Sequence, residues 1–299
     1  MKNKILIIII LFLLPIAVIS FQKEETNFNL PKNTSDIEVK VKIDDNTVTT
    51  MPLEEYVLGV VAAEMPASFH EEALKAQAIA ARTYTMSKLN KNANYEITGS
   101  DQAYITKEEM QTKWQDEYEK YYSKIESAVN TTKGEVLIND QNIITAFYFA
   151  MSNGYTEEAK TVFQIEEDYL KSVESSWEDE NITKFLVTIY VPKNEFCNKL
   201  ELTCNNLTIT NLKKTNSNRI ESLEIENKTF TGIEIRKKLN LRSTDFDINI
   251  NNNVIEITTK GYGHGVGMSQ YGANEMAKQN YKYQDILKHY YNDIEIITI

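Results

Sequence analysis

The sequence predicts an α+β fold of mixed helices and antiparallel strands. In the first half, apolar residues recur at helical spacing from Leu53 to Leu89. From Lys184 onward, short segments alternate apolar and polar residues, which is the two-residue period of strands. Helices and strands do not alternate regularly along the chain, so a parallel βαβ sheet is not expected. A hydrophobic content of 42% over 299 residues is ordinary for a globular protein with a sizeable core.

The N-terminal segment, residues 1–21, is predicted to be a single transmembrane helix. Lys2 and Lys4 precede an unbroken apolar stretch from Ile5 to Ile19. This stretch is slightly short for a membrane span and at the long end for a signal peptide. No clean small-x-small cleavage site follows it, which favours an uncleaved anchor over a cleaved signal. In either case the body of the protein is expected outside the cytoplasm, because the positive charges stay inside.

The rest of the chain is divided into a linker and one domain. Residues 22–36 are polar and aperiodic and are expected to be the linker, while residues 37–299 form the domain. Pro66 disfavours helical geometry at Met65, so one helix should end there and another should follow. The expected elements of the first half are a strand over 37–43, two helices within 53–89, a helix over 108–132, and strands over 135–138 and 143–151.

The second half is expected to be rich in strands. Thr231 is suited to cap a short helix that ends at Leu239. The expected strands cover 185–191, 207–210, 220–225, 246–250 and 254–259. After them come a glycine-rich loop, two helices and a final strand.

Charge and cysteine content limit the partners. A net charge of -11 argues against a nucleic-acid partner, which would require a basic surface. Cys197 and Cys204 are the only cysteines. A local disulfide and a pair of free buried thiols both fit their spacing on the oxidising side of a membrane. No Cys-x-x-Cys is present and the three histidines are scattered, so no zinc site and no cofactor are expected.

Glu64 is the main candidate for catalysis. Leu53, Val57, Val60 and Glu64 lie on one helix stripe, so a carboxylate ends an otherwise apolar face. Its position in the last turn before Pro66 places it near the negative end of the helix dipole. Partial burial and that dipole would both raise its pKa, and a carboxyl group that stays protonated can serve as a general acid. The alternative is a helix-terminal glutamate that points to solvent.

The following helix carries Lys75 and Arg82 on one shared face. The chain has only four arginines, so an arginine among small residues suggests a need for planar, bidentate hydrogen bonding. In the functional interpretation, Lys75 and Arg82 hold an anionic substrate group beside Glu64. In the structural alternative, Arg82 pairs with a carboxylate and closes the helix hairpin.

Two further segments supply candidate binding residues. Residues 261–273 hold five of the ten glycines, which lets the backbone approach a ligand closely, but they match neither a dinucleotide-binding nor a P-loop pattern. His264, Ser269 and Gln270 are the predicted neutral hydrogen-bonding groups of this loop; a structural loop with a buried histidine is the alternative. The turn over 152–157 adds three candidates, although such a turn alone is a weak signal. They are Ser152, Tyr155 and Thr156.

No second carboxylate stands out as a partner for Glu64, and no G-x-S-x-G motif supports a serine triad. A single acid suits a reaction in which the substrate supplies its own nucleophile.

Three runs carry a family resemblance. They are EEYVLGVVAAEMPASFHEEALKAQAIAARTY, SNGYTE and GYGHGVGMSQYGA. Together they resemble the stage II sporulation protein D family, over residues 37–299 and with the same kind of N-terminal anchor. The resemblance implies a membrane-anchored lytic transglycosylase with a glycan-binding cleft. Such enzymes act outside the cytoplasm, in the mother-cell membrane, and cleave peptidoglycan during forespore engulfment. Implied partners are the amidase stage II sporulation protein P, which strips stem peptides from the glycan, and the membrane protein stage II sporulation protein M.

The resemblance also implies residue roles. Glu64 aligns with the catalytic glutamate, and Lys75 and Arg82 align with the family's lysine and arginine. Glu64 would protonate the glycosidic oxygen after N-acetylmuramic acid and then deprotonate the C6 hydroxyl of that sugar, giving a 1,6-anhydro product. The free lactyl carboxylate would be bound by Lys75 or Arg82. Some relatives carry His and Cys ligands for zinc, but residues 146–160 here contain neither, so no metal is expected.

Two other functions remain open at this point. Related domains occur in amidase enhancers, so the chain could be a non-catalytic glycan-binding scaffold that stimulates a partner amidase. A hydrolase with two carboxylates is the third possibility.

Overall fold

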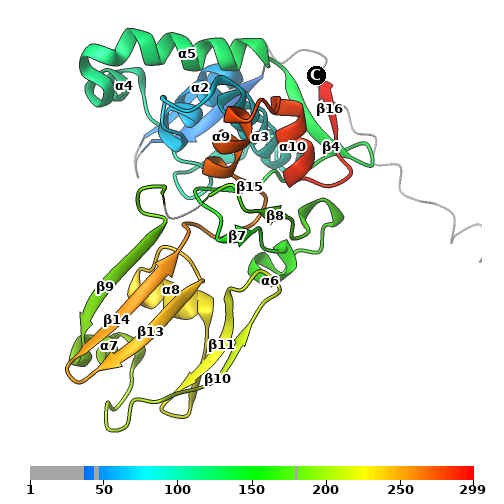
Figure 1. The fold of residues 1–299 in the computed structure, drawn as a ribbon. Coiled ribbons are helices and arrows are strands. Elements are labelled where there is room, and N and C mark those ends of the chain that lie inside the picture. Colours follow the sequence, from blue (N-terminus) through cyan, green and yellow to red (C-terminus); the bar gives the residue numbers. More distant parts are fainter. Residues whose placement is uncertain (1–36, 44–46, 179–180) are drawn as a thin grey trace, which may run out of the picture. The chain divides into compact units, whose positions relative to one another are not determined.

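Helices gather near the start of the domain and again at its C-terminal end (Figure 1). The computed structural model describes residues 37–43, 47–178 and 181–299. The expected anchor and linker, residues 1–21 and 22–36, lie outside the described residues, as do the boundaries assigned there. Within the described ranges, no helix is long and apolar enough to cross a membrane.

The long helix α3 (Glu71–Lys91) is the centre of the helical layer. All its residues from Glu72 to Ser87 are buried except Lys75. The many alanines of this run let neighbouring elements approach from several sides, which is how a helix becomes buried all round. Its helical neighbours are α2 (Leu53–Glu64), α5 (Tyr118–Thr131), α9 (Gln270–Lys278) and α10 (Tyr283–Tyr290). The larger hydrophobic core of the described chain lies among these helices.

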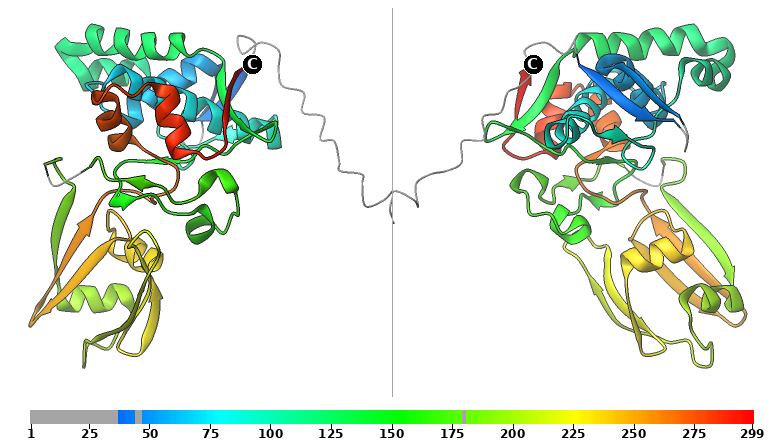
Figure 2. Two further views of the ribbon diagram at one scale, coloured as in Figure 1. Left: turned by 45° about the vertical axis from the view of Figure 1, so that its right-hand side comes forward. Right: turned by 180° about the vertical axis from the view of Figure 1, so that it is seen from behind.

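Short strands flank the helical layer. The pair β1 (Glu38–Lys42) and β2 (Val48–Pro52) is antiparallel, and β3 (Glu96–Ile97) joins β1 in parallel. The first two are the blue strands in the right-hand view of Figure 2. The C-terminal strand β16 (Glu295–Thr298) pairs with β4 (Glu135–Asn139), which also pairs with β5 (Asn142–Ile143).

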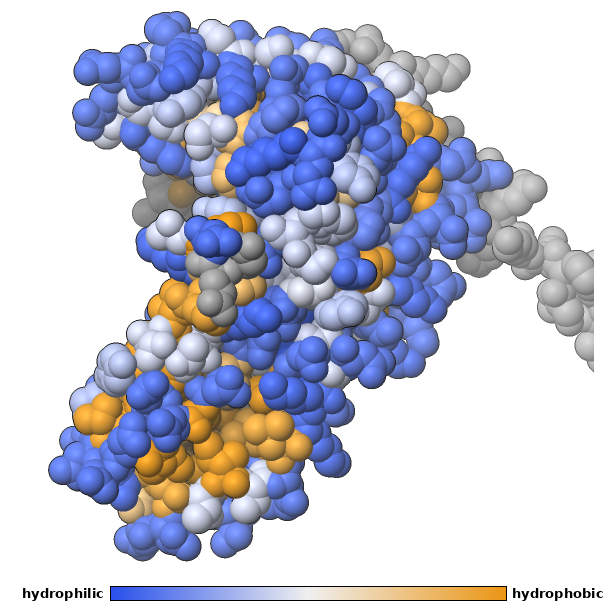
Figure 3. Space-filling model, viewed as in Figure 1, coloured by the Kyte–Doolittle hydropathy of each residue, from blue (hydrophilic) through white to orange (hydrophobic). Residues whose placement is uncertain are grey.

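The second half of the chain contains the β-rich region that the alternation predicts. Two antiparallel sheets and two helices enclose a separate hydrophobic core (Figure 1). Thr231 caps α8 as expected, and Glu234 completes a capping box. The elements are β9 (Leu186–Pro192), α7 (Lys193–Leu200), β10 (Ile209–Lys214), β11 (Ile220–Ile225), β12 (Lys228–Thr231), α8 (Gly232–Leu239), β13 (Phe246–Asn251) and β14 (Val254–Lys260). In Figure 3 apolar residues gather over this region, where Leu186, Leu212 and Val254 are exposed.

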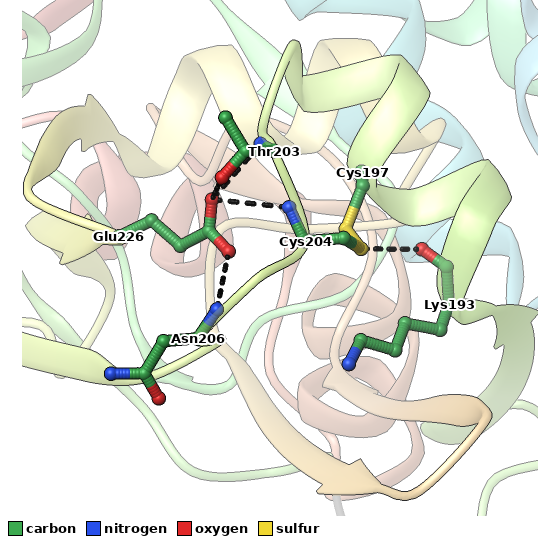
Figure 4. The surroundings of a disulfide bond; sticks show 6 residues. All are labelled: Lys193, Cys197, Thr203, Cys204, Asn206 and Glu226. Atoms are coloured by element: carbon green, nitrogen blue, oxygen red, sulfur yellow. Dashed lines mark hydrogen bonds between the residues drawn. A yellow bond between two sulfur atoms is a disulfide. The ribbon is translucent and has the colours of Figure 1, made fainter.

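Cys197 and Cys204 form a disulfide, which settles the alternative that the sequence left open. The bond joins α7 to the segment that follows it, with the two Cα atoms 5.9 Å apart (Figure 4). Glu226 holds the same segment, because its carboxylate accepts the backbone N–H groups of Thr203, Cys204 and Asn206. The loop is thus fixed both covalently and by charge-assisted hydrogen bonds.

A short parallel pairing connects distant parts of the chain. In it, β15 (Met268–Ser269) lies beside β6 (Tyr148–Phe149), with Met268 opposite Tyr148. The approach depends on Gly267, which has φ of 77°. A Cβ atom at that position would lie 1.9 Å from the carbonyl oxygen of Phe147. The remaining elements near this point are β7 (Gly154–Tyr155), α6 (Ala159–Phe163), η3 (Asp168–Leu170) and β8 (Glu174–Ser175).

Three expected elements differ from the structure. The strand expected over 207–210 begins and ends later, as β10. The single helix over 108–132 is divided into α4 (Lys107–Trp114), the 3₁₀ turn η2 (Gln115–Glu117) and α5. Gln115 has φ of 45°, which ends α4 and lets Trp114 pack against Tyr118 and Tyr121. In place of one strand over 143–151, the structure has the two short strands β5 and β6. They pair with different partners, β5 with β4 and β6 with β15. The mixed α+β class itself is confirmed.

Candidate active site

Glu64 is the last residue of α2, as the proline rule predicts. Met65 has extended dihedral angles, φ −114° and ψ 144°, directly before Pro66. The Glu64 side chain is half-buried and accepts two hydrogen bonds. The backbone N–H of Ala103 donates to Oε1 at 2.9 Å, and Nε2 of Gln270 donates to Oε2 at 3.4 Å. The carboxyl group is therefore held in place by a loop and by a helix that are far apart in sequence.

Burial raises the pKa of Glu64, and the hydrogen bonds from Ala103 and Gln270 only partly oppose that rise. The raised pKa expected from the sequence is thus confirmed in direction. A buried carboxyl group resists ionisation because the charged form loses hydration. Its charge in turn helps to raise the pKa of Tyr148, after burial as the main cause, so that this phenol stays neutral.

Two pockets adjoin Glu64. The first has a volume of about 400 Å³ and is lined by Glu64, Tyr84, Gly99, Ser100, Asp101, Gln102, Ala103, Phe147, Tyr148, Phe163 and His264. The second has about 440 Å³ and is lined by Ala63, Glu64, Met65, Pro66, Lys113, Ala150, Met151, Thr183, Lys184, Arg242, Tyr262, Gln270 and Tyr271. Glu64 belongs to both linings, so the two pockets adjoin at this residue.

The first pocket has an aromatic wall and a neutral histidine. Burial, together with the charges of Arg236 and Arg219, lowers the pKa of His264 to about 4. Nδ1 of His264 accepts the backbone N–H of Val266 at 3.1 Å, which leaves the proton of the neutral ring on Nε2. Its ring packs against Phe163 with centroids 5.2 Å apart. His264 is therefore a neutral group in this pocket.

Asp101 is the second carboxylate of the first pocket. Burial would raise its pKa, but hydrogen bonds from Thr98, Lys88 and Tyr95 outweigh burial and lower it. Oδ2 accepts hydrogen bonds from the backbone N–H and the hydroxyl group of Thr98. Oδ1 accepts a hydrogen bond from the hydroxyl group of Tyr95 at 3.0 Å and lies 3.2 Å from Nζ of Lys88. With both oxygens engaged, Asp101 fixes its loop and is poorly placed to act as a nucleophile.

Comparison with known proteins identifies the family. The family model described as "Stage II sporulation protein" matches residues 43–139. The chain is 41% identical over 265 residues to stage II sporulation protein D of Bacillus amyloliquefaciens, covering 85% of this chain and 77% of that protein. The same protein of Bacillus subtilis (strain 168) is 41% identical over 262 residues, covering 84% and 76%. The chain belongs to the stage II sporulation protein D family.

A more distant relative carries a different name. A Bacillus subtilis protein named "Amidase enhancer" is 27% identical over 288 residues, which is 78% of this chain and 39% of that protein. The chain is therefore a sporulation protein by family, and one of its more distant relatives is named for enhancing an amidase.

In this member of the family, Arg82 is fully buried in an ion pair with Glu54. Nη2 of Arg82 lies 2.6 Å from Oε2 of Glu54, and Nη1 donates to the carbonyl of Glu135 at 3.1 Å. Glu54 lies in the first turn of α2 and Glu64 at its end, about 15 Å away along the helix axis. This geometry favours the structural alternative for Arg82, in which it closes the helix hairpin.

Lys75 also faces away from Glu64. Its ammonium group pairs with Glu71 at 2.8 Å and with Glu72 at 3.1 Å. Gln77, two residues along α3, faces the site, because its Oε1 lies 3.5 Å from Nε2 of Gln270. Two residues correspond to about 200° around a helix, so Lys75 lies on nearly the opposite side. The structure does not bring Lys75 or Arg82 to the carboxyl group.

The candidates of the 152–157 turn lie behind the site and outside both linings. Ser152 and Thr156 are fully buried, and Thr156 Oγ1 accepts the N–H of Val173 at 2.9 Å. Tyr155 is 44% exposed and its carbonyl accepts a hydrogen bond from Arg219. These contacts give the turn a structural role.

Glu178 connects that turn to the glycine-rich loop. Its buried carboxylate accepts the backbone N–H of Ser152 at 2.8 Å and the hydroxyl groups of Ser175 and Ser269. Ser269 also caps α9 by accepting the N–H of Gly272, so Gln270 begins that helix in a fixed position. Ser269 therefore acts behind Gln270 and has no exposed surface for a ligand.

Several residues of the site were not predicted from the sequence. Gln77, Gln102, Ala103 and Tyr148 carry no motif signal, since three have uncharged side chains outside any recognised motif and Ala103 contributes its backbone. Arg242 could have been noticed as one of four arginines. In the described residues, no group of three or more His, Cys, Asp or Glu side chains is arranged to hold a metal ion.

Proposed function

We propose that this chain is a lytic transglycosylase that cleaves peptide-stripped peptidoglycan strands during forespore engulfment. The observation that carries the proposal is Glu64, whose carboxyl group has a raised pKa and which belongs to the linings of two pockets. A sugar chain laid across both pockets would have one glycosidic oxygen beside that group. Membership of the stage II sporulation protein D family supports the choice of peptidoglycan as substrate.

In the first step, protonated Glu64 gives its proton to the glycosidic oxygen between N-acetylmuramic acid and N-acetylglucosamine. The bond between that oxygen and C1 of the muramic sugar breaks, and N-acetylglucosamine leaves with a free hydroxyl group. The N–H of Ala103 and the amide of Gln270 stabilise the carboxylate that remains. Holding the acid in position removes much of the entropic cost of proton transfer.

In the second step, the Glu64 carboxylate takes the proton from the C6 hydroxyl of the same muramic sugar. The C6 oxygen attacks C1 and closes the 1,6-anhydro ring. The proton returns to Glu64, so the enzyme ends in its starting state and no water is consumed. A lone carboxyl group is sufficient for this sequence, which agrees with the engaged oxygens of Asp101.

The proposed setting follows from the N-terminal segment and the relatives. The apolar stretch from Ile5 to Ile19 would anchor the chain in the mother-cell membrane with the domain outside the cytoplasm. Stage II sporulation proteins P and M are the proposed partners, since an amidase must first remove the stem peptides. The disulfide between Cys197 and Cys204 suits an oxidising compartment.

The test uses purified protein and glycan strands freed of peptides. Wild type should release fragments that end in 1,6-anhydro-N-acetylmuramic acid, and Glu64→Gln should release at least about 100-fold fewer, as expected for loss of a general acid. Glu119→Gln, at an exposed position of α5, is the matched control and should behave as wild type. Equal product from wild type and Glu64→Gln would refute the proposal.

A second candidate function rests on the relative named "Amidase enhancer". In that case the chain binds glycan and stimulates a partner amidase without cutting. Amidase activity measured with and without the protein distinguishes the two functions, because a scaffold containing Glu64→Gln should stimulate as well as wild type.

A further inference from the structure

The two pockets beside Glu64 differ in charge. Among the described residues that line the second pocket are Lys113, Lys184 and Arg242, and Glu64 is the one acid of that described lining. The first pocket, as far as the described residues line it, contains Asp101 and Glu64 but no lysine or arginine. A substrate with one anionic and one neutral sugar would therefore bind in one orientation only, with the anionic sugar in the second pocket.

Arg242 is the best-placed of these cations. Its guanidinium group lies over the ring of Tyr262, 3.9 Å from the centroid, and its carbonyl accepts the N–H of Gly263 at 3.0 Å. The backbone contact and the stacking hold Arg242 and Tyr262 together as one rigid surface of the pocket. A stacked guanidinium keeps its donors in one plane, which is the geometry that binds a carboxylate through two hydrogen bonds.

In the part of the chain that the structure describes, the guanidinium group of Arg242 has no hydrogen-bond acceptor assigned to it. Nε is buried and has no hydrogen-bond partner, and no carboxylate among the described residues pairs with this side chain. The other arginines are committed elsewhere: Arg82 to Glu54, Arg219 to the carbonyl of Tyr155, and Arg236 to the carbonyl of Leu241. Arg242 is thus the arginine that combines free donors with a place in a pocket shared with Glu64.

Lys113 approaches the same pocket from α4. Its ammonium group donates to the carbonyl of Ala62 at 2.8 Å, in the last turn of the helix that carries Glu64. That contact uses one of its three hydrogens, which leaves two for a ligand. Burial lowers the pKa of Lys113. An anion in the pocket would offset this loss of hydration.

We propose that Arg242 and Lys113 bind the free lactyl carboxylate of N-acetylmuramic acid, so that this sugar occupies the second pocket. N-acetylglucosamine, the leaving group, then lies in the aromatic first pocket, and the strand crosses Glu64 in one direction. This inference rests on the proposed function. It accounts for a preference for peptide-stripped strands, because an amide bond to a stem peptide removes the negative charge and adds bulk at the same point.

The experiment measures binding, so that it does not depend on turnover. Glu64→Gln protein is titrated with two ligands: peptide-stripped glycan, and the same glycan with its lactyl carboxylates converted to neutral carboxamides. The free acid should bind about 10- to 100-fold more tightly, as expected for a charge-assisted bidentate contact. Adding Arg242→Met should remove most of that preference, Arg242→Lys should retain more of it, and Arg242→Met combined with Lys113→Met should abolish it.

Lys237→Met is the matched control, because it removes an exposed positive charge from α8, outside both pockets. It should leave the preference unchanged, and melting temperatures of all variants verify that they fold. Equal affinity for the acid and the amide, or a preference that Arg242→Met and Lys113→Met leave undiminished, would overturn the inference while leaving the transglycosylase proposal intact. If the preference for the carboxylate is found but the wild-type protein makes no anhydro product, the proposed function alone would be overturned. No binding of either glycan would contradict both.

Discussion

Gln270 donates its side-chain N–H to the Glu64 carboxylate at 3.4 Å, although 206 positions separate the two residues. Glu64 ends α2 and Gln270 begins α9, so the contact joins an early helix to a late one. The position of Gln270 depends on Ser269, which caps α9 and donates a hydrogen bond to Glu178. The two long motifs of the chain therefore meet at one carboxyl group.

Replacing Gln270 with alanine should shift the pH dependence of cleavage. The hydrogen bond from Gln270 lowers the pKa of Glu64, so its loss should raise that pKa further. Because the first step requires protonated Glu64, the fall of kcat/KM on the alkaline side should move to higher pH. We also expect a loss of about tenfold at the optimum from poorer positioning. A pH–rate profile checks this, and an unchanged or downward-shifted alkaline limb would contradict it.

The Glu64→Gln variant should be more stable than wild type at neutral pH. A carboxyl group whose pKa is raised in the folded state adds stability below its unfolded pKa, about 4.3, and that stability is lost as the pH rises through the folded pKa. Glutamine cannot ionise and should not show this loss. Thermal unfolding should give a melting temperature higher by about 2 °C at pH 8, with no gain at pH 4. A variant less stable than wild type at pH 8 would argue against a raised pKa.

Breaking the pair of Arg82 and Glu54 should destabilise the fold. Arg82→Met leaves the Glu54 carboxylate without its partner, which costs about 3–5 kcal/mol for a buried pair. The double variant Arg82→Met/Glu54→Gln should recover part of that loss, as chemical denaturation of both would show. If Arg82 instead binds substrate, Arg82→Lys would unfold like wild type yet lose cleavage, and the structural assignment would be wrong.

Removing the disulfide should affect stability without changing the site. Closing a loop between Cys197 and Cys204, seven positions apart, stabilises a fold by about 2–3 kcal/mol in the chain-entropy treatment. The Cys197→Ser/Cys204→Ser variant should therefore unfold more easily but keep its kcat on glycan. Reductant should destabilise wild type to the same extent and leave the double variant unaffected. A large loss of kcat in the folded double variant would contradict this, because it would mean that the disulfide affects the site around Glu64.

The local signals in the sequence predicted much of the fold. Pro66 ended α2 at the expected residue, and Thr231 began α8, because both effects depend on neighbouring residues alone. The region over 108–132 was mistaken for one helix, since the break at Gln115 serves the packing of Trp114 and involves no glycine or proline. The strand over 143–151 was overestimated, because its pairing partners come from distant parts of the chain.

The candidate site was predictable only in part. Glu64 stood out because a carboxylate ends an apolar stripe, and Gln270 because it lies in a glycine-rich loop. The partners of Lys75 and Arg82 could not be read from spacing, since the helix pattern gives a shared face but not what that face contacts. Arg242 comes from a bend before β13 and reaches the pocket only through the tertiary fold.

The most direct test of the account is the fate of the muramic C1 atom when peptide-stripped glycan is digested in water labelled with heavy oxygen. We predict products that end in 1,6-anhydro-N-acetylmuramic acid without label, formed by wild type and not by Glu64→Gln. Reducing-end products that carry one labelled oxygen would mean that water is the nucleophile, and the account of Glu64 as acid and then base on the C6 hydroxyl would be wrong.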